Sequence, residues 1–304
     1  MSENTPTASL LDLLCRLEGA YAPNTLRAYK ADMSEFIKYA SKSNCESLPA
    51  SPNTVAKFLE SVNDGSLKSS TIKRKAASIS AVHRLSSHTD PTKSLEVQIA
   101  LRKIYRQLGN RYDQAYPITR LILDQLLAVC GSDLRGKRNR ALLLLAYDSM
   151  RRRAELVSLR LDDMELQHDG GASILLRKSK TDQAGTGQWI HLSQESTAAV
   201  EAWLQEAGIT EGFVLRGIDT RGQITASLCD SRVGKIYKSL AKLARLEDRV
   251  IQQISGHSMR VGAAQDLLFR GASLPQIMVK GGWAKPDTVI RYVERVHRRT
   301  IALR

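Results

Sequence analysis

Towards the C-terminal end, the sequence places together four side chains that suit chemistry at an anionic centre. His257 and Arg260 are three residues apart, Trp283 follows two glycines, and Tyr292 comes nine residues later. The first three supply cationic or neutral N–H donors, and a tyrosine hydroxyl is an oxygen nucleophile. The same residues also suit a plain helical core, with packed aromatic residues and a solvated first helical turn. The spacing alone leaves both interpretations open.

Three short helices are predicted to position these side chains. The first carries an apolar stripe at helical spacing and ends before Gly271. The second begins after Ser273, a favourable N-cap residue, and ends at residues 281–282. The third follows a Lys-Pro-Asp turn and carries the tyrosine. Because the histidine and the arginine are three residues apart, both project from one face of the first turn.

This pattern resembles the C-terminal signature of the tyrosine recombinase family. The resemblance covers His-x-x-Arg, Gly-Gly-Trp and the following Tyr, in a helix–Gly–helix frame over SGHSMRVGAAQDLLFRGASLPQIMVKGGWAKPDTVIRY, residues 255–292. It implies an enzyme that cleaves DNA with Tyr292 as the nucleophile. His257, Arg260 and Trp283 would then bind the reacting phosphate. The family also requires an upstream arginine, an acid and a lysine.

The upstream arginine falls in MRRRAELVSLRLDD, where the family pattern is Arg-x-x-Glu or Arg-x-x-Asp at the start of a helix. Three consecutive arginines leave the register open on charge alone. Glu155 fixes it, since counting back three residues gives Arg152, and the two share a helix face. Glu155 is then predicted to orient neighbouring groups. Ser149 and Arg151 depart from the small apolar lead-in usual in the family, and Arg151 and Arg153 are predicted as additional DNA contacts.

The lysine is expected in a hairpin loop. Residues 172–177 and 188–192 are predicted strands, and residues 178–187 form the long connection between them. By resemblance, Lys180 in Ser-Lys-Thr is the catalytic lysine, and Lys178 is the competing candidate. A lysine in such a loop is otherwise an ordinary surface residue.

The residues assigned by resemblance fit the chemistry of phosphodiester exchange. In-line displacement places additional negative charge on the non-bridging oxygens, to which Arg152 and Arg260 can each donate two parallel hydrogen bonds. A free phenol has a pKa of about 10, and a cationic pocket would lower the pKa of Tyr292 and stabilise the attacking phenolate. Lys180 would protonate the leaving deoxyribose oxygen. We therefore expect no metal, no cofactor and no requirement for ATP.

The first third of the chain, residues 1–112, is predicted to be an all-α domain. The segment PNTLRAYKADMSEFIKYA resembles the core-binding domain of the same family, which clamps one face of a duplex. A helix over residues 69–85 combines an inward apolar stripe with a basic cluster. We expect this cluster to contact DNA phosphates, against the alternative of a solvated helix face. Its members are Lys73, Arg74, Lys75 and Arg84.

The rest of the chain, residues 113–304, is predicted to be a mixed α+β catalytic domain, mostly helical with a small antiparallel sheet. A linker without periodicity, residues 109–117, precedes it. A helix over residues 231–244 has an outer basic face, on which Arg232 and Lys235 are predicted to contact DNA.

Composition agrees with a nucleic-acid partner. The 304 residues include 45 Lys and Arg against 31 Asp and Glu, a net charge of +14, which favours a polyanion. A signal peptide and a membrane-spanning run are not apparent, so no membrane association is expected. Four separated cysteines predict free thiols in a reducing cytosol and no zinc site. We expect a cytoplasmic protein of bacterial, plasmid or phage context.

The resemblance implies a site-specific recombinase that forms a 3′-phosphotyrosine and passes through a Holliday junction. It would act as a homotetramer on double-stranded DNA with a specific site, and as a monomer when free in solution. One rival is a type IB topoisomerase-like enzyme, which uses similar chemistry as a monomer. Another is a DNA-binding regulator without catalysis. Such a regulator would not need all seven residues of the set Arg152, Glu155, Lys180, His257, Arg260, Trp283 and Tyr292.

Overall fold

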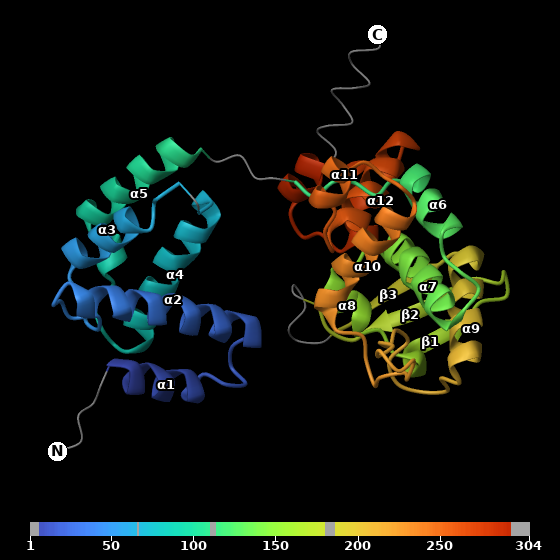
Figure 1. Cartoon of the computed structure of the whole chain (residues 1–304), viewed down its shortest axis with the longest axis horizontal. Helices are drawn as coiled ribbons and strands as arrows, with labels where there is room; N and C mark the ends of the chain where they lie inside the picture. The colour runs from blue at the N-terminus through green and yellow to red at the C-terminus, as the bar shows by residue number, and fades with distance from the viewer. Residues whose placement is uncertain (1–5, 66, 110–113, 180–185, 293–304) are drawn as a thin grey trace, which may run out of the picture. The chain divides into compact units, whose positions relative to one another are not determined.

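The computed structural model describes residues 6–65, 67–109, 114–179 and 186–292. The chain divides into two compact units, Met1–Tyr112 and Asp113–Arg304 (Figure 1). Each unit has its own hydrophobic core. Within the described ranges, no helix combines the length and the apolar character that crossing a membrane requires.

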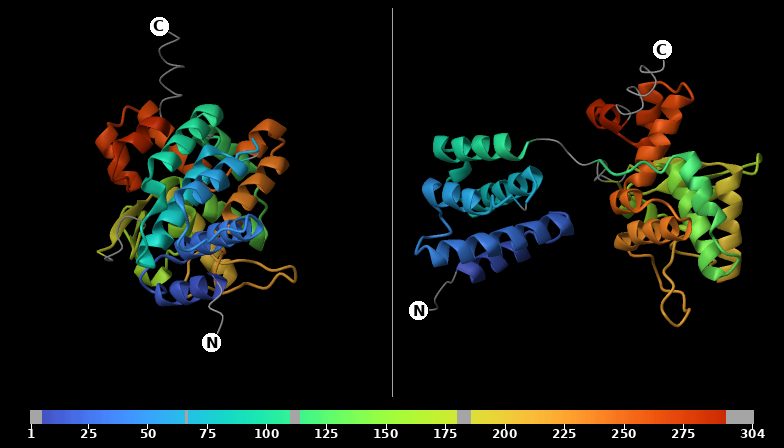
Figure 2. Two further views of the ribbon diagram at one scale, coloured as in Figure 1. Left: turned by 90° about the vertical axis from the view of Figure 1, so that its left-hand side faces the viewer. Right: turned by 45° about the horizontal axis from the view of Figure 1, so that its top comes forward.

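The N-terminal unit is all-helical in its described residues. Its elements are α1 (Pro6–Arg16), α2 (Pro23–Lys42), α3 (Pro52–Ser61), α4 (Ser69–Leu85), the 3-10 turn η1 (Pro91–Lys93) and α5 (Leu95–Leu108). Helix α1 packs on α2, α2 packs on α4, and α3 packs on α5. Figure 2 shows these helices in tiers, with α1 and α2 at one end of the unit and α5 at the other.

Apolar residues at helical spacing build the core of this unit. In α4, Ile72, Ile79 and Val82 are fully buried, which confirms the predicted stripe and the predicted bounds of this helix. The rings of Phe36 in α2 and Phe58 in α3 lie 5.1 Å apart in a tilted pair. The core therefore fixes which face of α4 is left for solvent.

The C-terminal unit surrounds a small sheet with helices. Its elements are α6 (Arg120–Ala128), α7 (Leu134–Ser149), α8 (Arg153–Val157), η2 (Leu161–Asp163), β1 (Met164–Leu166), β2 (Ala172–Leu176), β3 (Gln188–Leu192), α9 (Gln194–Ala207), α10 (Asp230–Leu243), α11 (Asp248–Gln253), α12 (Ser258–Phe269) and α13 (Leu274–Gly281). Residues 286–292 are also helical.

The sheet is antiparallel in the order β1-β2-β3, with Ile174 of the central strand opposite Met164 and Ile190. The expected hairpin is present, although β2 ends at Leu176, one residue earlier than predicted. The predicted fold class, helical with a small antiparallel sheet, is confirmed.

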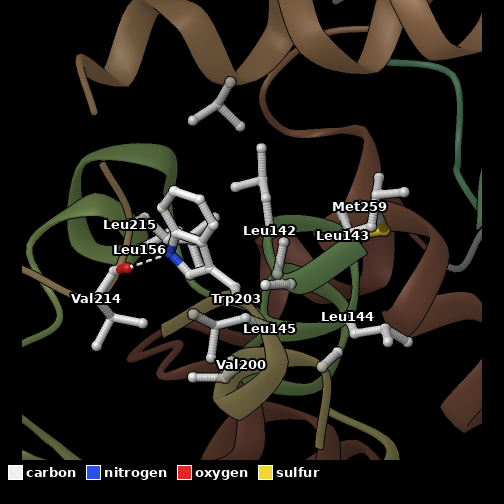
Figure 3. Close-up of a cluster of buried hydrophobic side chains, with 14 of the residues drawn as sticks. Leu142, Leu143, Leu144, Leu145, Leu156, Val200, Trp203, Val214, Leu215 and Met259 are labelled. Atoms are coloured by element: carbon white, nitrogen blue, oxygen red, sulfur yellow. Dashed lines mark hydrogen bonds between the residues drawn. The ribbon is translucent and has the colours of Figure 1, made fainter. Parts of the chain in front are cut away.

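Helix α7 is the central element of this unit. Its four consecutive leucines, residues 142–145, are all buried, because α7 packs against α9, β3 and α12 on different sides. Figure 3 shows Leu142 and Leu145 beside the indole of Trp203 and Leu143 on the side of Met259. The Trp203 Nε1 donates to the carbonyl oxygen of Val214 at 2.8 Å. A helix held on several sides gives a rigid support for the turn that follows it, residues 150–152.

Candidate active site

Arg152 directly precedes α8 and is held by an acid within the first turn. Its backbone N–H donates to Glu155 Oε2 at 3.0 Å, and its Nη1 donates to Glu155 Oε1 at 2.7 Å. The Glu155 side chain is buried, whereas that of Arg152 is 25% exposed. Glu155 thus fixes both the backbone and the guanidinium of Arg152 while part of the side chain stays accessible.

Arg260, in the first turn of α12, is a buried cation with an unused donor. It is 2% exposed. Its Nη1 donates to the carbonyl oxygen of Met150, and its Cζ lies 3.9 Å from the ring centroid of Trp283. Its Nη2 is buried and has no hydrogen-bond partner among the described residues. Burial, followed by the charge of Arg152, lowers the pKa of Arg260 to about 9, so the guanidinium remains charged at neutral pH.

The two glycines before Trp283 are required by its packing. The indole lies directly over Gly281, where a Cβ would overlap the ring. Gly282 ends α13 in the left-handed conformation, with φ at 64°. The ring of Trp283 meets that of Tyr292 edge to face, with centroids 5.9 Å apart and an interplanar angle of 71°. Trp283 therefore connects the buried arginine to the tyrosine.

Two glutamines hold the backbone of Tyr292, and neither was predicted from the sequence. Gln265 Nε2 donates to the Tyr292 carbonyl oxygen at 2.8 Å, and Gln114 Nε2 donates to the same atom at 3.3 Å. Gln265 is buried and lies four residues after the buried Val261. A polar residue on the apolar stripe of α12 was the available signal, since a buried amide requires partners.

His257 is the N-cap residue of α12 and is exposed. Its pKa is lowered, first by partial desolvation and then by the positive charges of Arg260, Arg153 and Arg152. The imidazole is therefore neutral at neutral pH in the free protein. A neutral ring keeps one N–H for donation to a substrate oxygen.

Six of the seven predicted residues are thus brought into one region. Contacts join Arg152 to Glu155 and link Arg260, Trp283 and Tyr292. His257 is the N-cap of the helix that carries Arg260, and the Arg153 side chain lies against the neighbouring Gly256. Lys180 lies outside the described residues, and its competitor Lys178 is exposed just after β2.

The predicted DNA contacts separate into exposed and buried side chains. The exposed ones are Lys73, Arg74, Arg84, Arg153, Arg232 and Lys235. Three of these arginines are engaged by an acid: Arg74 with Asp32 at 2.5 Å, Arg84 with Asp90 at 4.0 Å and Arg153 with Asp230 at 3.1 Å.

Two predicted DNA contacts are corrected, because both side chains point into the protein. Lys75 is 4% exposed and is ion-paired with Glu35, with Asp32 at 3.9 Å. Arg151 is also 4% exposed and is bound to Gln188 and to the carbonyl oxygen of Lys280. A side chain held in this way is not a surface contact for a phosphate backbone.

Comparison with known proteins identifies the family. Residues 118–298 match the model of the phage integrase family, and residues 13–88 match that of the phage integrase N-terminal SAM-like domain. The integrase/recombinase xerD homolog of Selenomonas ruminantium is 32% identical over 92% of this chain and 84% of its own. The recombinase cre of Escherichia phage P1 is 26% identical over 97% of this chain and 90% of its own.

Solved structures share the fold. The XerH site-specific recombinase in a post-cleavage complex with palindromic difH substrate matches with a TM-score of 0.69 and 18% identity, over 97% of this chain and 82% of that one. A lambda integrase dimer bound to a COC′ core site matches with a TM-score of 0.62 and 16% identity, over 95% and 77%. The chain belongs to the phage integrase family and is a tyrosine recombinase, an enzyme of site-specific DNA recombination. The predicted family is confirmed.

Proposed function

We propose that this recombinase cleaves DNA through a covalent 3′-phosphotyrosine bond to Tyr292. The observation that carries the proposal is the unused buried Nη2 of Arg260, beside the Trp283 and Tyr292 rings. A buried guanidinium donor without an acceptor is costly in the free protein. A non-bridging oxygen of a DNA phosphate is an acceptor that fits it.

In the proposed step, the Tyr292 Oη attacks the phosphorus as its proton passes to solvent. A P–O bond to tyrosine forms, the P–O5′ bond breaks, and the 5′-oxygen leaves as a hydroxyl with a proton from Lys180, or from Lys178 as the alternative. Arg152 and Arg260 stabilise the charge on the non-bridging oxygens, with His257 and Trp283 as further donors. The reverse step, with the 5′-hydroxyl of another strand, rejoins the DNA.

The wider scheme is also part of the proposal. The protein binds a specific double-stranded site, with exposed basic residues on phosphates, and four copies exchange strands through a Holliday junction. Metal, cofactor and ATP have no role in it. The protein acts in the cytoplasm. The xerD and cre relatives, which are recombinases by name, support this scheme.

Covalent capture tests the proposal. The substrate is a nicked duplex that carries a site selected from random DNA by binding to the protein. We expect the wild type and Tyr39→Phe, a control in the other unit, to become attached to the DNA, and Tyr292→Phe to bind the DNA without attachment. An adduct with Tyr292→Phe, or no adduct with any protein, would contradict the assignment. Strand exchange only at concentrations that give tetramers would then separate a recombinase from a topoisomerase.

A further inference from the structure

Three consecutive residues after α7 hold three separate parts of the catalytic unit. The carbonyl oxygen of Met150 accepts from Arg260, and Arg152 binds Glu155. Arg151, between them, is directed away from both: its Nη1 donates to Gln188 Oε1 at 2.8 Å, and its Nη2 donates to the carbonyl oxygen of Lys280 at 2.9 Å. One turn is therefore the common support of all these contacts.

The first partner of Arg151 stands at the base of the hairpin loop. Gln188 is the first residue of β3, directly after the connection, residues 178–187, that contains Lys180. Its own Nε2 donates to the carbonyl oxygen of Val279 at 3.3 Å. The side-chain amide of Gln188 is thus held at its oxygen by Arg151 and at its nitrogen by the Val279 carbonyl of α13.

The second partner of Arg151 lies in the turn before Trp283. The Lys280 carbonyl belongs to the last turn of α13, where carbonyl groups lack helical partners and a cation is favourable. The guanidinium also packs against the backbone at Gly282, where a Cβ would overlap Arg151 Nη1. Arg151 therefore joins the base of the loop to the turn that carries the indole.

Packing does not account for an arginine here. Arg151 is 4% exposed, and its Nε has no partner among the described residues. Within the same ranges no carboxylate forms an ion pair with it. An apolar side chain of similar length would fill this space without the cost of burying a charge. The contribution of Arg151 thus lies in its directed hydrogen bonds.

We propose that Arg151 is a positioning residue for strand cleavage, which holds Gln188, where the hairpin loop joins β3, against the turn that precedes Trp283. The proposed general acid, Lys180 or Lys178, belongs to that loop in the sequence. This inference rests on the proposed function. It assigns Arg151 no contact with DNA. It predicts that loss of Arg151 impairs protonation of the leaving group more than binding of the phosphate.

A substrate with sulfur in place of the 5′ bridging oxygen separates an effect on protonation of the leaving group from an effect on binding of the phosphate. The nicked duplex with the selected site is prepared with oxygen or with sulfur at the 5′ bridging position where the wild type forms its adduct. A thiolate leaves without a proton from a general acid, because a thiol is far more acidic than an alcohol. We expect Arg151→Met to bind the duplex like the wild type, to cleave the oxygen substrate about 100-fold more slowly, and to cleave the sulfur substrate within about threefold of the wild-type rate.

Further variants keep the test independent of folding. Gln188→Met should show the same kind of defect, and the two defects should combine less than additively in Arg151→Met/Gln188→Met, because each change removes the contact that the two side chains share. The double variant leaves neither side chain of that contact unpaired, although the carbonyl oxygens of Lys280 and Val279 lose their donors, so its Tm is measured to show that it is folded. Arg249→Met, a change at an exposed arginine of α11, should cleave both substrates normally.

Two results would overturn the inference. In one, Arg151→Met cleaves the oxygen substrate at the wild-type rate. In the other, both substrates are slowed equally, which would assign the residue to the phosphate pocket or to general stability. If instead the wild type forms no adduct, or Tyr292→Phe does form one, the proposed function itself fails, and this outcome is distinguishable because it does not involve Arg151.

Discussion

At the scale of single residues, the indole of Trp283 has two neighbours with different roles. Its face meets the guanidinium of Arg260, which a cation–π contact of this kind stabilises, and its ring meets Tyr292 edge to face. The position of Trp283 depends in turn on the missing side chain of Gly281. A side chain added at Gly281 would therefore disturb both Arg260, the proposed phosphate ligand, and Tyr292, the proposed nucleophile.

We predict that Gly281→Ala displaces the indole and lowers both thermal stability and adduct formation. The new methyl group would overlap the Trp283 ring, and overpacking of this type costs about 1–3 kcal/mol or more. Differential scanning fluorimetry and covalent capture measure the two effects. Gly271→Ala is the control, since Gly271 has φ at 85° but open space around a Cβ. The prediction fails if Gly281→Ala lowers the Tm and the adduct yield no more than Gly271→Ala does.

Residue spacing and the family resemblance predicted a set of site residues, six of which lie among the described residues, but charge alone misplaced two cations. Lys75 lies three residues after Ile72 and four before Ile79, on the buried stripe of α4, so periodicity could have shown that it is buried. Arg151 gave no such signal, because its direction depends on the turn at Met150 and on partners far away in sequence. Helix bounds and the sheet followed from local patterns, whereas these long-range contacts did not.

At the scale of elements, a buried acid joins α2 to the basic helix α4. Asp32 is 1% exposed and accepts from Arg74 Nη1 at 2.5 Å and from Ser78 Oγ at 2.7 Å. Arg74 remains 46% exposed, so its other donors can reach solvent. Asp32 thus orients an exposed arginine on the face proposed to bind DNA.

We predict that Asp32→Asn weakens DNA binding although it raises the net charge by one. Electrostatics alone would strengthen binding, since a negative charge near the phosphates is removed. Loss of the orienting carboxylate acts in the opposite direction, and we expect a net loss of about threefold or more. Fluorescence anisotropy with the selected duplex measures it, with Tm as a check on folding. Glu60→Gln, an exposed change of the same charge, should bind at least as tightly as the wild type. Tighter binding by Asp32→Asn would refute the orienting role.

A second contact within the N-terminal unit makes its stability depend on pH. The Ala50 N–H donates to His83 Nε2 at 2.9 Å, so Nδ1 carries the proton donated to the Ile79 carbonyl oxygen at 2.8 Å. The ring is fully buried, and this burial lowers the pKa of His83. The folded protein therefore favours the neutral ring, and protonation would remove the bond from Ala50.

We predict that the stability from this contact is complete above the unfolded pKa of His83, about 6.5, and is lost as the pH falls below it. The unfolded chain then binds more protons, which lowers the free energy of unfolding by up to about 1.4 kcal/mol per pH unit. Urea titrations between pH 5 and 8 measure this dependence. His83→Gln should flatten it, whereas the exposed His168→Gln should not. An unchanged slope in His83→Gln would disprove the assignment.

At the scale of the whole molecule, both compact units carry exposed cations in a chain of net charge +14. Lys73 belongs to α4 of the first unit, and Lys235 belongs to α10 of the second. If both units bind one duplex, their phosphate contacts add to a single salt dependence.

We predict that Lys73→Gln and Lys235→Gln each reduce the slope of log K against log salt by about 0.9, and that the double variant reduces it by about twice as much. Binding titrations between about 50 and 200 mM salt give the slopes. The exposed Lys57→Gln serves as the reference for loss of charge alone. Equal slopes for the wild type, the two single variants and the double variant would exclude Lys73 and Lys235 as phosphate contacts.

The buried cations at Arg151 and Arg260 also bear on how this protein would respond to selection. Both guanidiniums carry a buried nitrogen without a partner in the described part of the chain. Apolar replacements at these positions would remove a buried charge, so a screen of a variant library for heat resistance alone would retain them wherever this gain offsets the lost hydrogen bonds to Met150, Gln188 and Lys280. Screening the same library for recombination would remove them. The two enrichment profiles should therefore diverge most at these positions, which would mark the catalytic centre without any knowledge of the DNA site.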